Sequence, residues 1–190
     1  MSKRMLGPTT QLYPMPAVLL AVKTDVGANL MAVAWVGIVA GQPPMLAMEV
    51  GARHYTTPFL DKEGECTVNV PSAAMAVGVD YCGSVSGTDD PNKAATCGWT
   101  LQPSRLVSAP LVAECPVSFE CRVTSKVAAG RGSFYLCEIV ETHVDEEVLD
   151  ERGRPDARLV DPLIFTPDGA YARLGDSLGR AWQIGRALKR

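Results

Sequence analysis

Several polar side chains in this sequence could hold a phosphate group. The stretch Ala52–Thr57 (ARHYTT) combines the guanidinium of Arg53 with the hydroxyls of Thr56 and Thr57, and it opens a predicted helix whose free amides favour an anion. A phosphate dianion needs a positive charge and several hydrogen-bond donors. The same residues also suit a capped helix with an exposed arginine, so both interpretations stay open for this stretch alone.

A second polar stretch, Gly83–Lys93 (GSVSGTDDPNK), could complete such a site. Ser84 and Ser86 can donate hydrogen bonds, Lys93 adds a charge, and the glycines let the backbone approach a ligand closely. The two adjacent aspartates work against a phosphate beside them. The alternative is a polar surface loop without a ligand.

The third candidate is Asn29–Val39 (NLMAVAWVGIV), which we interpret as part of one strand with two different faces. Small or branched apolar residues on one face are expected to fill a barrel interior. The other face mixes an amide, a thioether, an indole and a bare glycine, which suits a flat ligand or another subunit. An ordinary core or dimer strand is the alternative. The first face holds Leu30, Ala32, Ala34, Val36 and Ile38, and the second holds Asn29, Met31, Val33, Trp35 and Gly37.

Motifs for other chemistry are absent from the sequence. It contains no GxGxxG, no GxxxxGK[ST] and no HExxH. The six cysteines are irregularly spaced without a CxxC pair, and only His54 and His143 could join them, so we expect no metal site. The thiols are interpreted as small apolar core residues, although a cysteine nucleophile stays open. We therefore assign no catalytic residue of the protein's own.

Composition and charge restrict the class of protein. The 190 residues suit one domain, 47% of them are hydrophobic and 21% charged, and the net charge of −3 gives no basic field for a nucleic acid. A membrane-spanning helix needs about 20 apolar residues, whereas Val26–Ala40 is shorter and is followed by Gly-Gln-Pro-Pro. Without a persuasive secretory signal, we expect six reduced thiols in a cytoplasmic protein.

Short apolar runs separated by turn residues predict a mainly β fold. The first three runs have only tight turns between them, which excludes parallel strands with crossover helices. We predict six or seven antiparallel strands in a small β-barrel with a few short helices. The predicted strands are Pro16–Lys23, Asn29–Ala40, Met45–Val50, Glu65–Val70, Pro116–Thr124 and Ser133–Val140. The predicted helical segments are Tyr55–Lys62, Pro71–Asp80, Lys93–Thr96 and Asp176–Arg190, with a polar loop at Cys82–Asn92.

The order of these stretches resembles the flavoredoxin or flavin reductase-like family. The residues that carry the resemblance are Asn29–Leu60 (NLMAVAWVGIVAGQPPMLAMEVGARHYTTPFL), Gly64–Ser72 (GECTVNVPS), Ser86–Gly98 (SGTDDPNKAATCG) and Ser108–Val123 (SAPLVAECPVSFECRV). The run N-x-M-x-x-x-W, followed by PP, R-x-x-T and VN, is specific in combination. The similarity implies a single split-barrel domain over 1–190, with a core at about 13–144 and a C-terminal extension at 145–190.

The resemblance also implies a homodimer that holds FMN non-covalently at the subunit interface. Asn29 and the backbone of Ala34–Gly37 would then meet the isoalloxazine ring, and Tyr171 would cover it. Arg53 would lie near the phosphate, with Ser84, Ser86 and Lys93 completing the contacts. The full set of expected cofactor-binding residues is Asn29, Ala34, Trp35, Val36, Gly37, Arg53, His54, Tyr55, Thr56, Ser84, Ser86, Lys93 and Tyr171.

One departure from the family pattern bears on the electron donor. Many NAD(P)H-dependent members carry a Gly-Asp-His motif in a late strand, where this chain has Gly130–Ser133 (GRGS) and Cys137 in place of a later glycine. We expect an oxidoreductase that passes electrons from NAD(P)H or a redox protein through FMN to an acceptor. The alternatives are an electron carrier without NAD(P)H activity and a cofactor-free dimeric binding protein.

Overall fold

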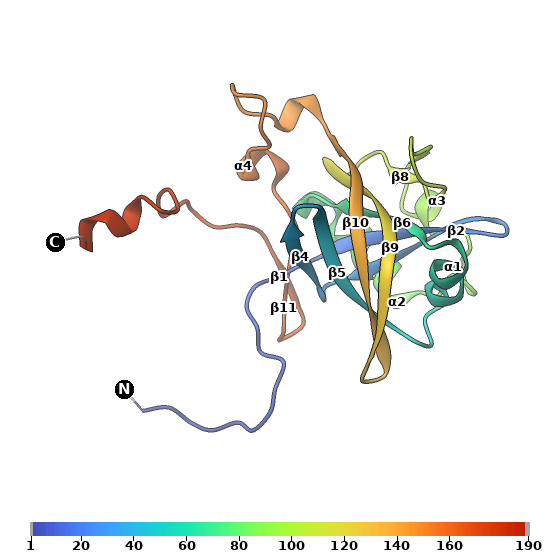
Figure 1. The fold of residues 1–190 in the computed structure, drawn as a ribbon, viewed down its shortest axis with the longest axis horizontal. Helices are drawn as coiled ribbons and strands as arrows, with labels where there is room; N and C mark the ends of the chain where they lie inside the picture. Colours follow the sequence, from blue (N-terminus) through green and yellow to red (C-terminus); the bar gives the residue numbers. More distant parts are fainter. Residues whose placement is uncertain (1, 189–190) are drawn as a thin grey trace.

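The computed structural model describes residues 2–188 and is built on one seven-stranded antiparallel sheet (Figure 1). Its strand order is β3-β2-β6-β9-β10-β5-β4. The strands are β2 (Val18–Thr24), β3 (Gly27–Val33), β4 (Val36–Gly41), β5 (Pro44–Gly51), β6 (Glu65–Val70), β9 (Val117–Ala129) and β10 (Gly132–Val144). The expected mainly β, antiparallel fold with short helices is confirmed.

Shorter elements surround this sheet. Three of them, β1 (Met15–Pro16), β11 (Ile164–Thr166) and β12 (Ala170–Ala172), form a small sheet that the sequence did not reveal, and β7 (Leu101–Gln102) pairs with β8 (Leu111–Val112). The helices are α1 (Thr56–Glu63), α2 (Ala76–Ser84), α3 (Lys93–Thr96) and α4 (Ala157–Val160), with 3₁₀ turns η1 (Ala73–Met75), η2 (Glu146–Val148) and η3 (Ile184–Leu188). No helix within residues 2–188 is long and apolar enough to cross a membrane.

Two apolar cores lie on opposite faces of β2 and β3. The interior core includes Leu20 of β2, Met48 of β5 and Leu60 of α1. The second core lies under α2, where Val79 packs with Leu19 and Leu30. Because both faces are covered, β2 is apolar at nearly every position and does not alternate.

The predicted single strand Asn29–Ala40 is wrong. The chain breaks it at Ala34 and Trp35, so that β3 pairs with β2 at one end of the sheet while β4 pairs with β5 at the other end. A hydrogen bond from the Glu49 amide to the Trp35 carbonyl (2.9 Å) holds the break against β5.

The predicted assignment of the two faces is also wrong in part. Leu30 and Ala32 pack beneath α2, whereas Met31 and Val33 pack on the interior core. After the break Val36 packs on the interior core, as predicted, but Ile38 is 66% exposed. Both faces of β3 are covered by apolar residues, so the alternation in the sequence does not indicate which face lines the barrel interior.

The structure also differs from the predictions in two hairpin strands, one helix end and the C-terminal segment. Strands β9 and β10 are longer than expected because the hairpin continues past the end of β6, with β10 still paired to β5, to a turn at Gly130, whose φ is +57°. Helix α2 reaches Ser84, so the start of the predicted loop Cys82–Asn92 is helical. The predicted helix Asp176–Arg190 is wrong over the described part, where only η3 is helical.

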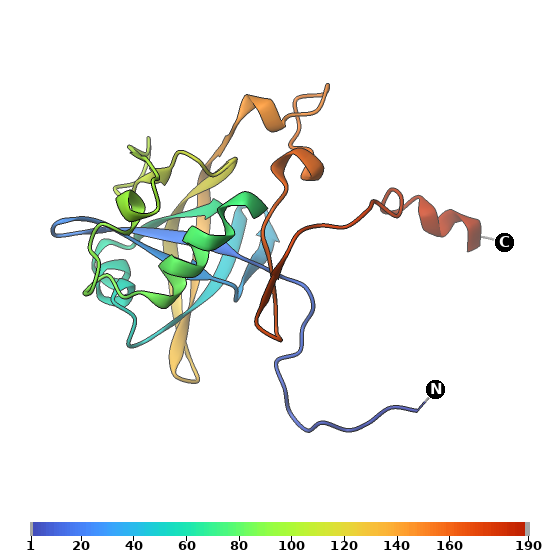
Figure 2. The ribbon, with the colours of Figure 1, turned by 180° about the vertical axis from the view of Figure 1, so that it is seen from behind.

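The C-terminal tail does not fold as a helix because its apolar side chains have no core to pack against. Leu178, Trp182 and Leu188 are almost fully exposed. Figure 2 shows the tail extending away from the sheet. Positions 189 and 190 lie outside the described residues.

Candidate functional site

A polar cavity of about 250 Å³ lies between β3, the turn before α1 and the C-terminal end of α2. It joins the three stretches that the sequence singled out, although they are far apart along the chain. Of the expected site residues, the cavity is lined by Asn29, Arg53, His54, Tyr55, Thr56, Ser84, Ser86 and Lys93. Its other lining residues, which are outside the expected set of cofactor-binding residues, are Met31, Cys82, Gly83, Val85 and Gly87.

Asn29 is buried at this cavity with one half of its amide unused. Its Nδ2 donates to Thr56 Oγ1 (2.9 Å), and Thr56 Oγ1 in turn donates to Met31 Sδ (3.4 Å). Its Oδ1 is buried and accepts no hydrogen bond from residues 2–188. A buried acceptor without a donor costs about 1–3 kcal/mol, so the cavity favours a ligand that can donate there.

Gly87 brings its backbone close to this free acceptor. A Cβ at position 87 would collide with Asn29 Oδ1 and with the Tyr55 ring, so only glycine fits. In the sequence this position is a glycine between Ser86 and Thr88. We interpreted the glycines of this stretch only as backbone that can approach a ligand closely, so the contact of Gly87 with Asn29 was not predicted.

Lys93 lies beneath the cavity and holds the end of α2. Its side chain is 4% exposed, and Nζ donates to the carbonyls of Val85 (2.8 Å) and Cys82 (3.3 Å). Burial lowers the pKa of Lys93. An ammonium carries three N–H donors, so two serve the helix end and a third remains for a ligand. The sequence predicted the charge at this site but not its structural task.

A second cavity, of about 280 Å³, adjoins the first through Gly83 and Ser84. Small side chains form one side of it, including Ala32 and Ala34, and Tyr171 contributes an aromatic ring. The Tyr171 hydroxyl donates to Asp80 Oδ1 (3.3 Å), and burial raises the pKa of Tyr171. Small and aromatic walls beside a polar cavity suit a flat ring that carries a polar tail.

Three of the expected residues lie apart from both cavities. Trp35, Val36 and Gly37 line a separate apolar cleft of about 500 Å³, together with Phe134 of β10. Ala34 lines this cleft as well as the second cavity, so the two are adjacent. Trp35 is 49% exposed there. A ring contact by these three residues remains a prediction.

Cys82 is the cysteine at the polar cavity, and its environment argues against a reactive thiol. It is 1% exposed, and burial raises the pKa of Cys82 to about 12. At neutral pH the thiol is protonated and is a poor nucleophile. All six cysteines are free thiols, and no group of three potential metal ligands occurs in the described part of the chain.

The joined cavities can therefore bind and orient a ligand rather than attack one. They offer cations, hydroxyls, a free acceptor and a flat apolar wall, without an activated nucleophile. Chemistry at such a site would come from what it binds.

Comparisons with known proteins agree with this description. The family model of the flavin reductase like domain matches residues 10–174. The flavoredoxin of Desulfovibrio vulgaris (Miyazaki F) is 34% identical, covers 97% of this chain and 100% of its own, and superposes with a TM-score of 0.90. The flavoredoxin from Methanosarcina acetivorans is also 34% identical, covering 99% and 100%, with a TM-score of 0.92.

A third structure establishes the type of barrel. A putative flavin reductase with a split barrel domain from Shewanella frigidimarina is 22% identical, covers 88% of this chain and 85% of its own, and has a TM-score of 0.78. This likeness confirms the split-barrel fold. Since the family model spans most of the sequence, the chain belongs to the flavin reductase-like family.

Proposed function

We propose that this protein binds FMN non-covalently in the two joined cavities and passes electrons through it to an acceptor. The observation that carries the proposal is the buried, unused Oδ1 of Asn29 in a cavity that also holds Arg53 and Lys93. The hydroxyls of the FMN sugar chain can donate to such an acceptor, and its phosphate suits two cationic side chains.

The two cavities divide the cofactor between them. The phosphate and the sugar chain fit the polar cavity, where Arg53, Thr56, Ser84, Ser86 and Lys93 supply charge and donors. The ring fits the second cavity, against Ala34 and beneath Tyr171. Solved flavoredoxins at 34% identity and the family as a whole support FMN as the bound flavin.

The bound flavin supplies the hydride and electron chemistry. The chain's own residues bind it, fix its orientation and keep water from one of its faces. Donors and acceptors fixed before the reaction stabilise changes of charge on a bound ring at little reorganisation cost. This division of labour agrees with the absence of an activated thiol in the polar cavity.

A second candidate function is that of an electron carrier without NAD(P)H activity of its own. It is favoured by the sequence Gly130–Ser133, where the histidine of many NAD(P)H-dependent relatives is missing. The two flavoredoxins, which cover 97% and 99% of this chain, support it as well.

One experiment tests both candidates. The purified protein is loaded with FMN, and its visible flavin absorbance is followed anaerobically after addition of NADPH or NADH. Rapid bleaching supports the oxidoreductase, and an unchanged spectrum that dithionite can still bleach supports the carrier. A folded, colourless protein that takes up no added FMN would defeat both and leave a cofactor-free binding protein.

We also propose that a second copy of the chain covers the apolar cleft beside the ring cavity. Trp35, Ile38, Val39 and Phe134 expose between 40% and 66% of their surface there, which is unusual for large apolar side chains gathered at one place. Ala34 connects this face with the ring cavity, as a cofactor at a dimer interface requires. Sedimentation velocity should give a dimer, and Ile38→Glu should shift it towards monomer.

The free thiols support a reducing, cytoplasmic setting.

A further inference from the structure

The last part of the described chain, residues 174–188, forms a C-terminal arm that does not pack on its own barrel. Figure 1 and Figure 2 show that this arm and the N-terminal segment leave the molecule on the same side, beyond β1 and β11. An ion pair between Arg173 and Asp161 (3.0 Å) fixes the point where the arm begins. The large apolar side chains of the arm are between 46% and 94% exposed, and they are Leu174, Leu178, Trp182, Ile184 and Leu188. Such a group of apolar side chains on one segment indicates a surface that covers it.

The outer face of β5 and β10 presents an apolar surface to solvent. Buried and more exposed positions alternate along both strands, so that Met48 and Tyr135 point into the interior core and their neighbours point outwards. The outward residues lie opposite each other as the pairs Phe134 with Glu49, Leu136 with Ala47 and Glu138 with Met45. This outer face is therefore apolar in the middle and has a carboxylate at either end.

The outer face continues into the apolar cleft that we assign to a second copy of the chain. Ala47 and Phe134 line that cleft together with Trp35. The arm departs at the edge of the same cleft, because Met15 and Pro16 of β1 line it, β1 pairs with β11, and β11 pairs with β12. In a two-fold dimer the same patch of both copies meets. An arm that leaves one copy at the edge of this patch is therefore directed at the surface of the other copy.

We propose that the C-terminal arm of one copy lies across the outer face of the other, so that two copies exchange their arms reciprocally. The inference rests on the proposed dimer and adds a contact that holds it together. Leu178 and Trp182 of the arm cover Phe134 and Leu136 of the partner copy, which removes apolar surface of both copies from water. An extended chain spans about 3.3 Å per residue, so the arm is long enough to cross two strands.

The charges of the arm and of the outer face are complementary. Arg180 and Arg186 are exposed cations of the arm, and the outer face offers Glu49 and Glu138 to them. Neither carboxylate takes part in an ion pair within residues 2–188. A single exposed ion pair contributes little, but like charges placed opposite each other are repulsive. Reversal of these charges is therefore a sensitive test of the contact.

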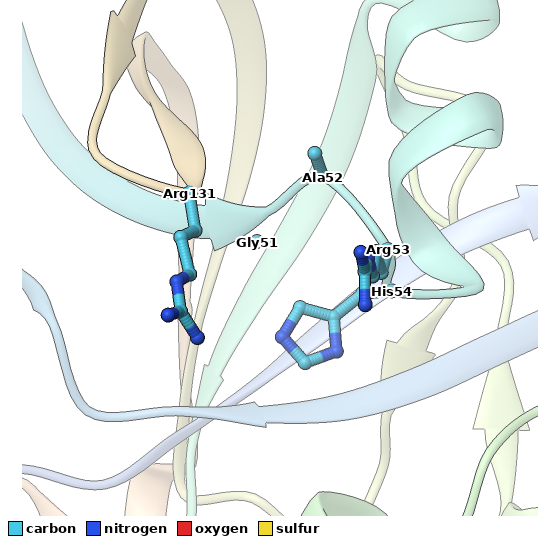
Figure 3. Close-up of a pocket in the computed structure, with 5 residues that line it drawn as sticks. All are labelled: Gly51, Ala52, Arg53, His54 and Arg131. Carbon is cyan, nitrogen blue, oxygen red and sulfur yellow. The ribbon is translucent and has the colours of Figure 1, made fainter.

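A wider cleft beside the polar cavity, at the start of β10, would repel the arm. It has a volume of about 700 Å³ and is lined by Gly51, Ala52, Arg53, His54 and Arg131. Figure 3 shows Arg131, from the turn between β9 and β10, on one side of the cleft and Arg53 with His54, from the turn before α1, on the other. None of the described residues that line this cleft is acidic. The cations of the arm therefore find opposite charge on the outer face and like charge in this cleft.

The test reverses the charges of the arm and of the outer face in two separate variants of the full chain. One variant carries Arg180→Glu with Arg186→Glu, and the other carries Glu49→Lys with Glu138→Lys. Each variant alone would bring like charges together in its dimer, whereas a mixed dimer would pair opposite charges at both arms. We expect the dissociation constant of the dimer, measured by sedimentation, to rise about ten-fold or more in each variant. In an equimolar mixture it should return to within about three-fold of the wild-type value.

A third variant and a control complete the experiment. Leu178→Ser with Trp182→Ser should also raise the dissociation constant of the dimer about ten-fold or more, since apolar contact area is lost. The control Arg152→Glu reverses a charge in an exposed turn outside both surfaces and should keep the wild-type value.

The outcomes separate the arm contact from the dimer itself. Dimers of wild-type affinity in the charge variants and in the apolar variant would overturn the arm exchange alone. A mixture that dimerises no better than its two components would also overturn it, because an arm that lies on its own copy gains nothing from mixing. A wild-type chain that stays monomeric would overturn the proposed dimer and the arm exchange with it.

Discussion

Asn29 Nδ2 donates a hydrogen bond of 2.9 Å to Thr56 Oγ1, and this contact fixes the amide with its Oδ1 at the backbone of Gly87. No donor in the described part of the chain reaches that oxygen. A second buried asparagine, Asn69, is different. Its Nδ2 donates to Leu19 O and Thr67 Oγ1, and its Oδ1 accepts from Val112 N and Ser118 Oγ. One asparagine therefore serves the fold, and the other has an acceptor to offer a ligand.

This contrast gives the first prediction. Asn29→Ala should weaken FMN binding about ten-fold while changing the free energy of unfolding by less than about 1 kcal/mol, because the lost bond is offset by removal of an unpaired acceptor. Asn69→Ala should lower the free energy of unfolding by about 2–4 kcal/mol, because four hydrogen bonds within the protein are lost.

Flavin fluorescence titration and urea unfolding of the flavin-free protein measure the two quantities. A large loss of stability in Asn29→Ala, with FMN affinity retained, would contradict the assignment of Asn29 to the ligand.

The second prediction concerns the charge of Arg53. Arg53→Glu should weaken FMN binding by ten-fold or more, since a cation at the proposed phosphate site is replaced by an anion. The side chain is exposed, so the thermal unfolding midpoint should stay close to that of wild type. Arg152→Glu makes the same change of charge in a turn remote from the cavities and serves as the control. If both variants bound FMN equally, Arg53 would not contact the phosphate.

The fold could be predicted to a large extent because its signals are local. Alternation in Pro116–Thr124 and in Ser133–Val140 predicted β9 and β10, and turn residues predicted where β2, β5 and β6 end. The break at Ala34 and Trp35 could not be predicted in this way, since both residues are compatible with a continuing strand. It arises because the chain must pass from one edge of the sheet to the other.

The candidate site was predictable in its residues and less so in its contacts. Arginine, threonine and serine in turns indicated a phosphate, and the structure brings Arg53, Thr56 and Ser84 to one cavity. Gly87 was missed because a glycine in a polar loop has many possible reasons. The cleft lined by Arg53, His54 and Arg131 was missed because it depends on the pairing of β10 with β5, in which Gly132 pairs with Gly51, 81 positions away.

A third prediction follows from the two tasks of Lys93. Because Nζ holds the carbonyls of Cys82 and Val85, Lys93→Met should lower the free energy of unfolding by about 1–3 kcal/mol. It should also weaken FMN binding, since the positive charge is lost. Chemical unfolding of the flavin-free protein separates the first effect from the second. Unchanged stability with a large loss of FMN affinity would show that Lys93 serves only the ligand.

The last prediction concerns pH and lies away from the cavities. The buried carboxylate of Glu120 accepts hydrogen bonds from the amides of Arg105, Leu106 and Val107, and its Oε1 lies 2.6 Å from His143 Nε2. Burial alone would raise the pKa of Glu120, but the amides and His143 outweigh it and lower the pKa below its usual 4.5.

A carboxyl group with a lowered pKa in the folded state stabilises the protein fully above its unfolded pKa. Stability is then lost as the pH falls from about 4.5 through the lower folded value. Glu120→Gln should cost about 1–3 kcal/mol at pH 7, because one amide donor would face other donors, and should flatten the decline of stability in acid. Urea unfolding between pH 7 and pH 3 measures both effects, with the exposed Glu151→Gln as the control. If the free energy of unfolding of Glu120→Gln declined as steeply in acid as that of wild type, the decline would arise from other carboxylates.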